Sequence, residues 1–255
     1  MILIREIGNW QRGQVVAKTA PSTRAILPHV ERTIEHAWAE ASARLGAKLF
    51  DGPMCRLERM EASHDVLRLW VSPTSYKPFL GTNLTGIDVP ANALANPLGL
   101  SVALVTSDDW LMLGRRNASV AYYPNRIHPF AGSLEPAELD DVFRGVLREL
   151  DEELSLAESD IADMRCLGLI EDAKLRQPEI IFSARATRTR ADIESSLDNA
   201  EHHAAVAVEA SPRAVESMMR DPLMTPVAVG TLALWGRIAF GDAWFASIRG
   251  SIESA

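Results

Sequence analysis

The segment from residue 139 to residue 154 constrains the fold most, because it carries an apolar and an acidic stripe at helical spacing. The apolar stripe repeats every three or four residues and consists of Phe143, Val146, Leu147, Leu150 and Leu154. At the helical rotation of about 100° per residue, Glu149, Glu152 and Glu153 share a sector of about 100°. The pattern predicts an amphipathic helix that packs one face on a core and holds three carboxylates on another.

The three carboxylates need an explanation, because like charges on one helix face repel each other. A hard divalent cation such as Mg²⁺ or Mn²⁺ takes oxygen ligands and would offset the repulsion. The alternative is a solvated acidic face on a surface helix. The three glutamates alone do not decide between these two interpretations.

Strands surround this helix along the chain, which is typical of an α/β protein. Short β-branched or alternating runs predict strands at 100–106, 110–113, 179–184 and 204–209. Helical segments are expected within 226–245. Residues 96–255 are therefore expected to form one domain in which a mixed sheet lies between helices.

The first part of the chain has a different texture. Apolar spacing predicts a helix over 28–45, and two alternating runs at 56–61 and 66–71 predict a β-hairpin. Residues 81–97 are rich in Gly, Asn, Pro and Thr and predict a linker or lobe boundary. We expect a smaller N-terminal α+β lobe over residues 1–95.

The acidic helix is part of a longer motif. Gly132 and Glu138 are spaced as G-x5-E, residues 148–153 are Arg-Glu-Leu-Asp-Glu-Glu, and Leu156 follows at an aliphatic position. This segment resembles the Nudix box, G-x5-E-x7-R-E-U-x-E-E-x-G-U with U aliphatic. The resemblance implies a Nudix α/β/α sandwich with a mixed sheet over residues 96–255.

The motif departs from the Nudix box in three places. Nine residues instead of seven separate Glu138 from Arg148, Ser155 replaces the last glycine, and residues 130–132 are Phe-Ala-Gly instead of Pro-Gly-Gly. The insertion is expected to lengthen the loop before the helix and to leave the glutamate face intact. Ser155 is expected to weaken the left-handed helix end that glycine would supply.

The resemblance also implies roles for particular residues. Glu149, Glu152 and Glu153 would bind Mg²⁺ or Mn²⁺, with Gly132 allowing close backbone approach and offering its carbonyl as a ligand. Arg148 would pair with a neighbouring glutamate and fix the helix geometry. Many Nudix enzymes have a further catalytic glutamate on a late loop, and the resemblance implies that Glu201 has this role. Arg115 and Arg116 are expected to hold the diphosphate, and Glu179 to contact the base or the metal site. Because side chains alternate along a strand, only one of the two arginines is expected to face the site. His202 and His203 are expected to be solvated or capping histidines.

A closer resemblance extends into the N-terminal part. Residues 49–53, 74–83 and 96–99 look like the animal Nudix hydrolases that cleave UDP-glucose and UDP-galactose. This similarity implies hydrolysis of a UDP-sugar to UMP and a sugar 1-phosphate, with Tyr76 and Lys77 at the nucleotide. Two alternatives stay open. One is a pyrophosphatase of ADP-ribose or another dinucleotide, and the other is a non-catalytic Nudix-derived module that binds nucleotides.

Composition limits the classes of partner that we expect. The chain has 26 Lys and Arg against 34 Asp and Glu, a net charge of −8, which argues against broad nucleic-acid binding. The two cysteines, Cys55 and Cys166, exclude a disulfide framework and are expected to be buried thiols. Neither a signal peptide nor a membrane span is predicted, so we expect a cytoplasmic protein acting on a small molecule away from membranes. The sequence does not predict the oligomeric state.

Overall fold

A large mixed sheet organises the computed structural model, which describes residues 1–198 and 200–254. Its eight strands follow the order β1-β9-β10-β5-β6-β11, with β7 paired to β6 and β8 to β5. The strands are β1 (Ile2–Trp10), β5 (Gly99–Val105), β6 (Trp110–Arg116), β7 (Ile127–His128), β8 (Phe130–Ser133), β9 (Ile161–Asp172), β10 (Gln177–Ala186) and β11 (His202–Glu209). The pairing of β10 with β5 is parallel, and the neighbouring pairs are antiparallel.

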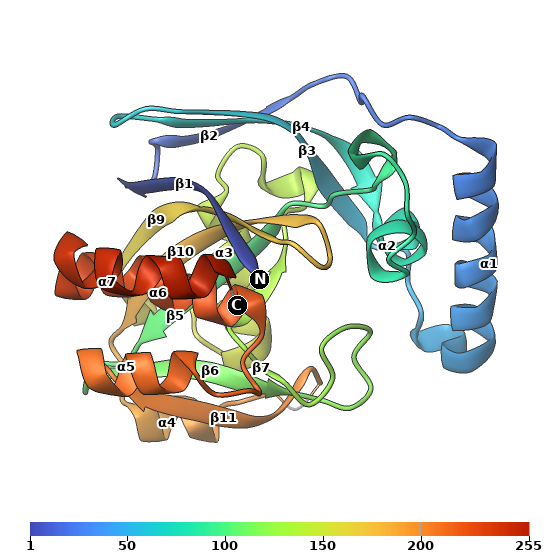
Figure 1. Ribbon diagram of the computed structural model, residues 1–255. Helices are drawn as coiled ribbons and strands as arrows, with labels where there is room; N and C mark the ends of the chain where they lie inside the picture. The colour runs from blue at the N-terminus through green and yellow to red at the C-terminus, as the bar shows by residue number, and fades with distance from the viewer. Residues whose placement is uncertain (199, 255) are drawn as a thin grey trace.

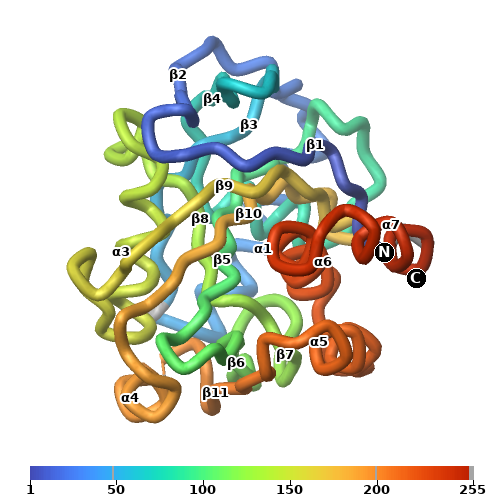
Figure 2. The backbone as a smooth tube through the Cα atoms, turned by 90° about the vertical axis from the view of Figure 1, so that its left-hand side faces the viewer, coloured from blue at the N-terminus to red at the C-terminus, as the bar shows by residue number. Residues whose placement is uncertain are grey.

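Helices cover both faces of this sheet, as Figure 2 shows with α3 on one side and α6 and α7 on the other. Helix α3 (Phe143–Leu154) packs on Leu100 and Val102 of β5, while α6 (Pro226–Phe240) packs on Ala103 of the same strand. α6 is apolar on most of its surface because α5 (Pro212–Met219) and α7 (Asp242–Ser254) cover its outer side. The predicted α/β sandwich with a mixed sheet is confirmed.

A second, three-stranded sheet has the order β2-β4-β3, with β2 (Val15–Thr19), β3 (Pro53–Ala62) and β4 (Leu67–Ser75). The predicted hairpin is β3–β4, and the predicted helix is α1 (Pro28–Leu45), which stands at the far edge of the molecule in Figure 1. The division into residues 1–95 and 96–255 stays a prediction. The structure adds that β1, at the start of the first segment, pairs with β9 in the large sheet.

The segment predicted as a linker or lobe boundary is partly buried. A short helix α2 (Tyr76–Phe79) runs into a π-helical turn at Leu80–Leu84, and a 3₁₀ turn follows at Ala91–Ala93. Asn83 is buried and donates from Nδ2 to the carbonyl of Leu175, 2.9 Å away, in the turn between β9 and β10. The polar composition that predicts a linker serves here to satisfy backbone groups between the two sheets.

Two local predictions concern the ends of α3. The helix begins at Phe143 rather than at residue 139, because Pro136–Glu138 forms a 3₁₀ turn that Glu138 caps. Ser155 ends the helix in the left-handed conformation, with φ 51° and ψ 41°, as the missing glycine would. A side chain in this conformation costs about 1–2 kcal/mol, so the weakening expected from Ser155 stays a prediction.

The remaining features concern the cysteines, helix α4 and the length of the apolar helices. Cys55 and Cys166 are free and buried, as predicted. Helix α4 (Arg190–Ser195) precedes β11 and contacts it. Within the described chain, no helix is both long and apolar enough to cross a bilayer.

Candidate active site

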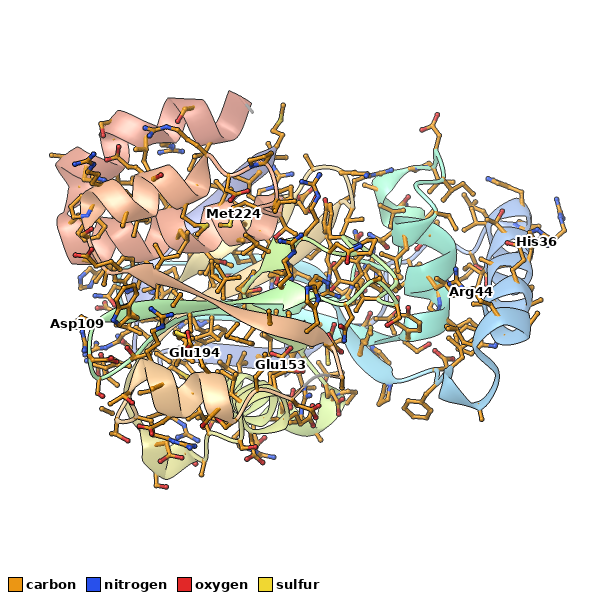
Figure 3. The ribbon with its side chains drawn as sticks, turned by 90° about the horizontal axis from the view of Figure 1, so that it is seen from below. His36, Arg44, Asp109, Glu153, Glu194 and Met224 are labelled. Atoms are coloured by element: carbon orange, nitrogen blue, oxygen red, sulfur yellow. The ribbon has the colours of Figure 1, made fainter. Side chains whose placement is uncertain are left out.

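Helix α3 turns two of its three glutamates inward. Its apolar residues Val146, Leu150 and Leu154 are buried against the sheet, which fixes the rotation of the helix. The side chains of Glu149 and Glu153 are 13% and 7% exposed, whereas that of Glu152 is 58% exposed. Figure 3 shows Glu153 on the α3 side of the sheet, opposite the layer of α6 and α7. A solvated acidic face therefore describes Glu152 only.

Glu149 lies directly on the backbone of Gly132 in β8. A Cβ atom at Gly132 would come within 1.6 Å of Glu149 Oε1. Gly132 pairs with Leu100 of β5 and so faces the same side of the sheet as α3. This close approach is the physical reason for glycine at the first position of the motif.

Arg148 holds the motif together. Its Nε donates to Glu138 Oε1 at 2.8 Å, and its Nη1 lies 2.6 Å from Glu149 Oε1. Nη2 donates to the carbonyl of Ser133 at 3.2 Å, and Nη1 also lies 3.3 Å from Glu152 Oε2. The guanidinium thus joins the start of the motif, β8 and the glutamate face. Because these contacts occupy the guanidinium, we expect Arg148 to hold the geometry of the motif rather than to contact a ligand.

Glu153 reaches further along the sheet edge. The backbone N–H of Ala131 donates to Glu153 Oε2 at 3.2 Å. Glu153 Oε1 is buried and has no hydrogen-bond partner among the described residues, although His202 Nδ1 lies 3.2 Å away. The two atoms are close, but the angle between them is not that of a hydrogen bond. A buried carboxylate oxygen without a partner needs a hydrogen-bond donor or a cation to satisfy it.

His202 was not predicted at the site, and the expectation that it is solvated or capping is wrong. Its side chain is 1% exposed, because a bulge between His202 and Ala204 changes the register of β11. Regular alternation from Ala205 would put His203 on the α3 side of the sheet, and the bulge puts His202 there instead. His203 is exposed.

Burial sets the electrostatics of this group. It raises the pKa of Glu149 to about 8, with Arg148 opposing and the charge of Glu153 adding to the effect. Burial likewise raises the pKa of Glu153 well above its ordinary value, and the charge of Glu201 adds to this. The pKa of His202 is lowered to about 4 by burial and by the nearby Arg116. Burial is the largest cause of all three shifts.

Arg116 faces this site, and Arg115 does not. Met112 of β6 packs with α3 and Leu113 packs with α6, so alternation places Arg116 on the α3 side and Arg115 on the other. The guanidinium of Arg116 is 4% exposed, stacks 4.6 Å from the ring centre of Tyr122, and has Nη1 4.0 Å from Glu201 Oε2. Its Nε has no partner among the described residues. A buried guanidinium with a spare donor is suited to an anion.

Tyr76 lies at the same end of the sheet, at the contact between the two parts of the fold. Burial raises its pKa, and the charges of Glu201 and Arg116 act on it as well. An edge-to-face series of rings joins Tyr76 to Phe79 and Phe79 to Tyr122, with centroids 6.3 Å apart in each pair. Tyr76 is therefore positioned near the arginine that faces the site.

The structure does not bring Lys77 and Glu179 to the glutamates. Lys77 Nζ pairs with Glu35 of α1 at 2.7 Å. Glu179 lies on the face of β10 that carries Ile181, which packs with α6, and it accepts a hydrogen bond from Ser101. Burial raises the pKa of Glu179 to about 7, while Ser101 lowers it.

The donor set fits a hard divalent cation in chemistry. Among the residues that the structure describes, no three His, Cys, Asp or Glu side chains are already arranged around one metal position. Glu149, Glu152 and Glu153 nevertheless offer only oxygen, and Glu153 Oε1 is unsatisfied. A cation would also counter the burial that raises the pKa values of Glu149 and Glu153.

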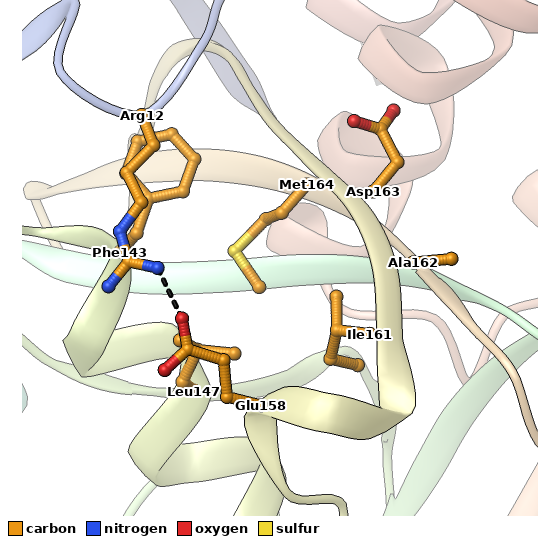
Figure 4. A pocket seen from close by; sticks show the side chains of 8 residues that line it. All are labelled: Arg12, Phe143, Leu147, Glu158, Ile161, Ala162, Asp163 and Met164. Atoms are coloured by element: carbon orange, nitrogen blue, oxygen red, sulfur yellow. Dashed lines mark hydrogen bonds and ion pairs between the residues drawn. The ribbon is translucent and has the colours of Figure 1, made fainter.

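A separate pocket lies at the other side of α3, between this helix and the start of β9 (Figure 4). It has a volume of about 220 Å³ and is lined by Phe143, Leu147 and Met164. Arg12 lies across it and pairs with Asp141 and Glu158. None of the glutamates of the candidate site lines this pocket.

Comparison with known proteins gives relatives at moderate identity. No protein-family model matches the chain. It is 28% identical over 204 residues to uridine diphosphate glucose pyrophosphatase NUDT22 of Mus musculus, covering 66% of each chain. It is 28% identical over 198 residues to the Homo sapiens protein of the same name, covering 64% of this chain and 65% of that one. The chain thus spans about two thirds of the length of the curated relatives it matches. Among solved structures, a mutT/nudix family protein from Listeria innocua is 16% identical, with a TM-score of 0.44, over 56% of this chain and 93% of that chain.

Proposed function

We propose, from the premise that this chain resembles the Nudix UDP-glucose pyrophosphatases, that it hydrolyses a nucleoside diphosphate joined to a sugar. That resemblance is predicted by the sequence and borne out by its curated relatives. The proposed substrates are UDP-sugars such as UDP-glucose and UDP-galactose. Water cleaves the bond between the two phosphates, and the products are UMP and a sugar 1-phosphate.

One observation carries the proposal: the buried carboxylates of Glu149 and Glu153 lie on the same side of the sheet as a buried arginine with a spare donor. Carboxylates alone would repel a diphosphate, and an arginine alone would bind any anion. Together they suit a substrate that arrives with, or meets, a divalent cation. Arg116 then serves the phosphate oxygens through charge-assisted hydrogen bonds.

Each residue has a role that follows from its contacts. Glu149, Glu152 and Glu153 would hold Mg²⁺ or Mn²⁺, which when bound would polarise a phosphoryl oxygen. Gly132 gives Glu149 the room to lie against β8, and Arg148 fixes the carboxylate from the other side. Glu201, 55% exposed and beside Arg116, is the proposed further carboxylate at the open edge of the site.

The nucleotide end is assigned to the surface where the two parts of the chain meet. Tyr76 and Tyr122 supply aromatic edges there, close to Arg116. A pocket that satisfies the polar edge of uracil would leave groups unpaired against a purine, which is a strong basis for discrimination. Lys77 and Glu179 are not given roles, because the first is paired with α1 and the second lies on the other face of the sheet.

A substrate panel tests this proposal. The purified chain with Mg²⁺ is incubated with UDP-glucose, UDP-galactose and ADP-ribose, and nucleoside monophosphates are separated by chromatography. The proposal predicts UMP as the product and a kcat/KM for UDP-sugars at least tenfold above that for ADP-ribose. A higher kcat/KM for ADP-ribose would reject the UDP-sugar assignment. Binding of nucleotides without any product would identify a binding module instead.

A further inference from the structure

His202 is a buried polar side chain at the site to which the proposed reaction gives no role. Its side chain is 1% exposed, and both of its ring nitrogens lack a hydrogen-bond partner among the described residues. Nδ1 lies 3.2 Å from Oε1 of Glu153, which is itself buried without a partner. A buried polar group without a partner destabilises a fold, so the arrangement of these two side chains needs an explanation.

Packing fixes the direction of the imidazole ring. The ring lies on the backbone of Gly114 in β6, where a Cβ atom would come within 2.2 Å of His202 Cδ2. Phe130 of β8 meets the ring edge to face, with centroids 5.4 Å apart. Glycine on one side and an aromatic ring on the other leave the imidazole little freedom to turn away from Glu153.

Glu153 is approached from two sides. The N–H of Ala131 donates to Oε2, and the imidazole Nδ1 faces Oε1. In the tautomer that carries a proton on Nδ1, this nitrogen is a donor 3.2 Å from the acceptor Oε1 of Glu153.

We propose that His202 is a positioning residue: its Nδ1–H donates to Glu153 Oε1 and holds this carboxylate in the orientation that binds the divalent cation. The inference rests on the proposed function, because it assigns Glu153 to the cation. Outer partners that orient a metal-binding side chain typically change metal affinity about 10- to 100-fold when they are replaced.

Four variants test the proposal through metal affinity rather than activity alone. His202→Asn places an amide N–H near the position of Nδ1, His202→Gln places it near Nε2, and His202→Leu removes it. His203→Asn is the matched control, since His203 is the adjacent histidine but is exposed. The rise in melting temperature with Mn²⁺ concentration gives an apparent Kd for each protein, and kcat and KM for UDP-glucose are measured beside it.

The expected result is a Kd for Mn²⁺ raised about tenfold or more in His202→Leu and His202→Gln. In His202→Asn and His203→Asn the Kd stays within about threefold of wild type, and the loss of activity in the first two falls on kcat. If His202→Leu does not fold, the Asn and Gln pair decides. Equal Mn²⁺ affinity in these two variants, or wild-type affinity in His202→Leu, overturns the role of His202. A wild-type protein that binds no Mn²⁺ overturns the cation site itself and, with it, the proposed function.

Discussion

Replacing Glu149 by glutamine tests the electrostatics of the site without substrate. Burial raises the pKa of Glu149 to about 8 from an ordinary value of 4.5. Without a cation, the folded protein holds a proton on this carboxyl between these pH values, and the unfolded chain does not. The folded state therefore loses stability as pH rises through this range, and the loss levels off above about pH 8.

The size of the effect follows from the same values. One pKa unit corresponds to about 1.4 kcal/mol, so this carboxyl destabilises the metal-free fold by about 3 kcal/mol between pH 5 and pH 8. Glutamine carries no charge at any pH. In chelator, the free energy of unfolding of Glu149→Gln minus that of wild type should therefore increase by about 3 kcal/mol over this range. The loss of the contact with Arg148 lowers the free energy of unfolding of the variant at every pH. It does not change how the difference from wild type varies with pH.

Urea denaturation in EDTA at pH 5, 6, 7 and 8 measures the effect. Glu152→Gln is the matched control, because Glu152 lies on the same helix but its side chain is 58% exposed. Its difference from wild type should stay nearly constant with pH. The reasoning is refuted if the Glu149→Gln difference does not grow with pH, or if Glu152→Gln shows the same growth. Saturating Mg²⁺ should stabilise wild type more than Glu149→Gln.

Two further substitutions test the geometry of the site. Gly132→Ala should lower kcat/KM at least 100-fold, because its Cβ would displace Glu149 from β8. Gly250→Ala is the control and should leave kcat/KM unchanged, because a Cβ there meets no atom within 4 Å. Wild-type kinetics for Gly132→Ala would contradict the placement of Glu149. Arg116→Gln should raise KM for UDP-glucose about tenfold or more, because a charge-assisted contact is lost. Arg115→Gln should change this KM little. An equal effect of the two substitutions would contradict the alternation that puts only Arg116 at the site.

The sequence predicted the parts of the fold and site that depend on local periodicity. The helical stripes of residues 139–154 gave the rotation of α3, because the apolar face must pack on the sheet. The same periodicity does not distinguish an inward from an outward glutamate. Glu152 is exposed and Glu149 is buried because of the way α3 packs against β8. This packing depends on contacts between residues that are distant in sequence.

Other features depend on pairing between distant segments, which local patterns do not contain. The bulge in β11 moved His202 to the α3 side, and alternation from the predicted strand at residue 204 gives no sign of it. The roles of Lys77 and Glu179 at the substrate stay predictions, and the structure gives only the present surroundings of the two side chains. The first is paired with Glu35, and the second lies on the opposite face of the sheet from α3. Residues 81–97 have the composition of a linker or lobe boundary, but Asn83 within them is buried and donates to the carbonyl of Leu175, which is distant in sequence.

Cation-dependent release of UMP from UDP-glucose tests the central claim most directly. Wild type and Glu153→Gln are compared at matched folded fraction, in EDTA and across a range of Mg²⁺ concentrations. We expect no UMP in EDTA, full recovery of wild-type activity on addition of Mg²⁺, and a rate at least 100-fold lower for Glu153→Gln at every Mg²⁺ concentration. Turnover by wild type in EDTA, or wild-type rates for folded Glu153→Gln, would contradict the assignment of this site.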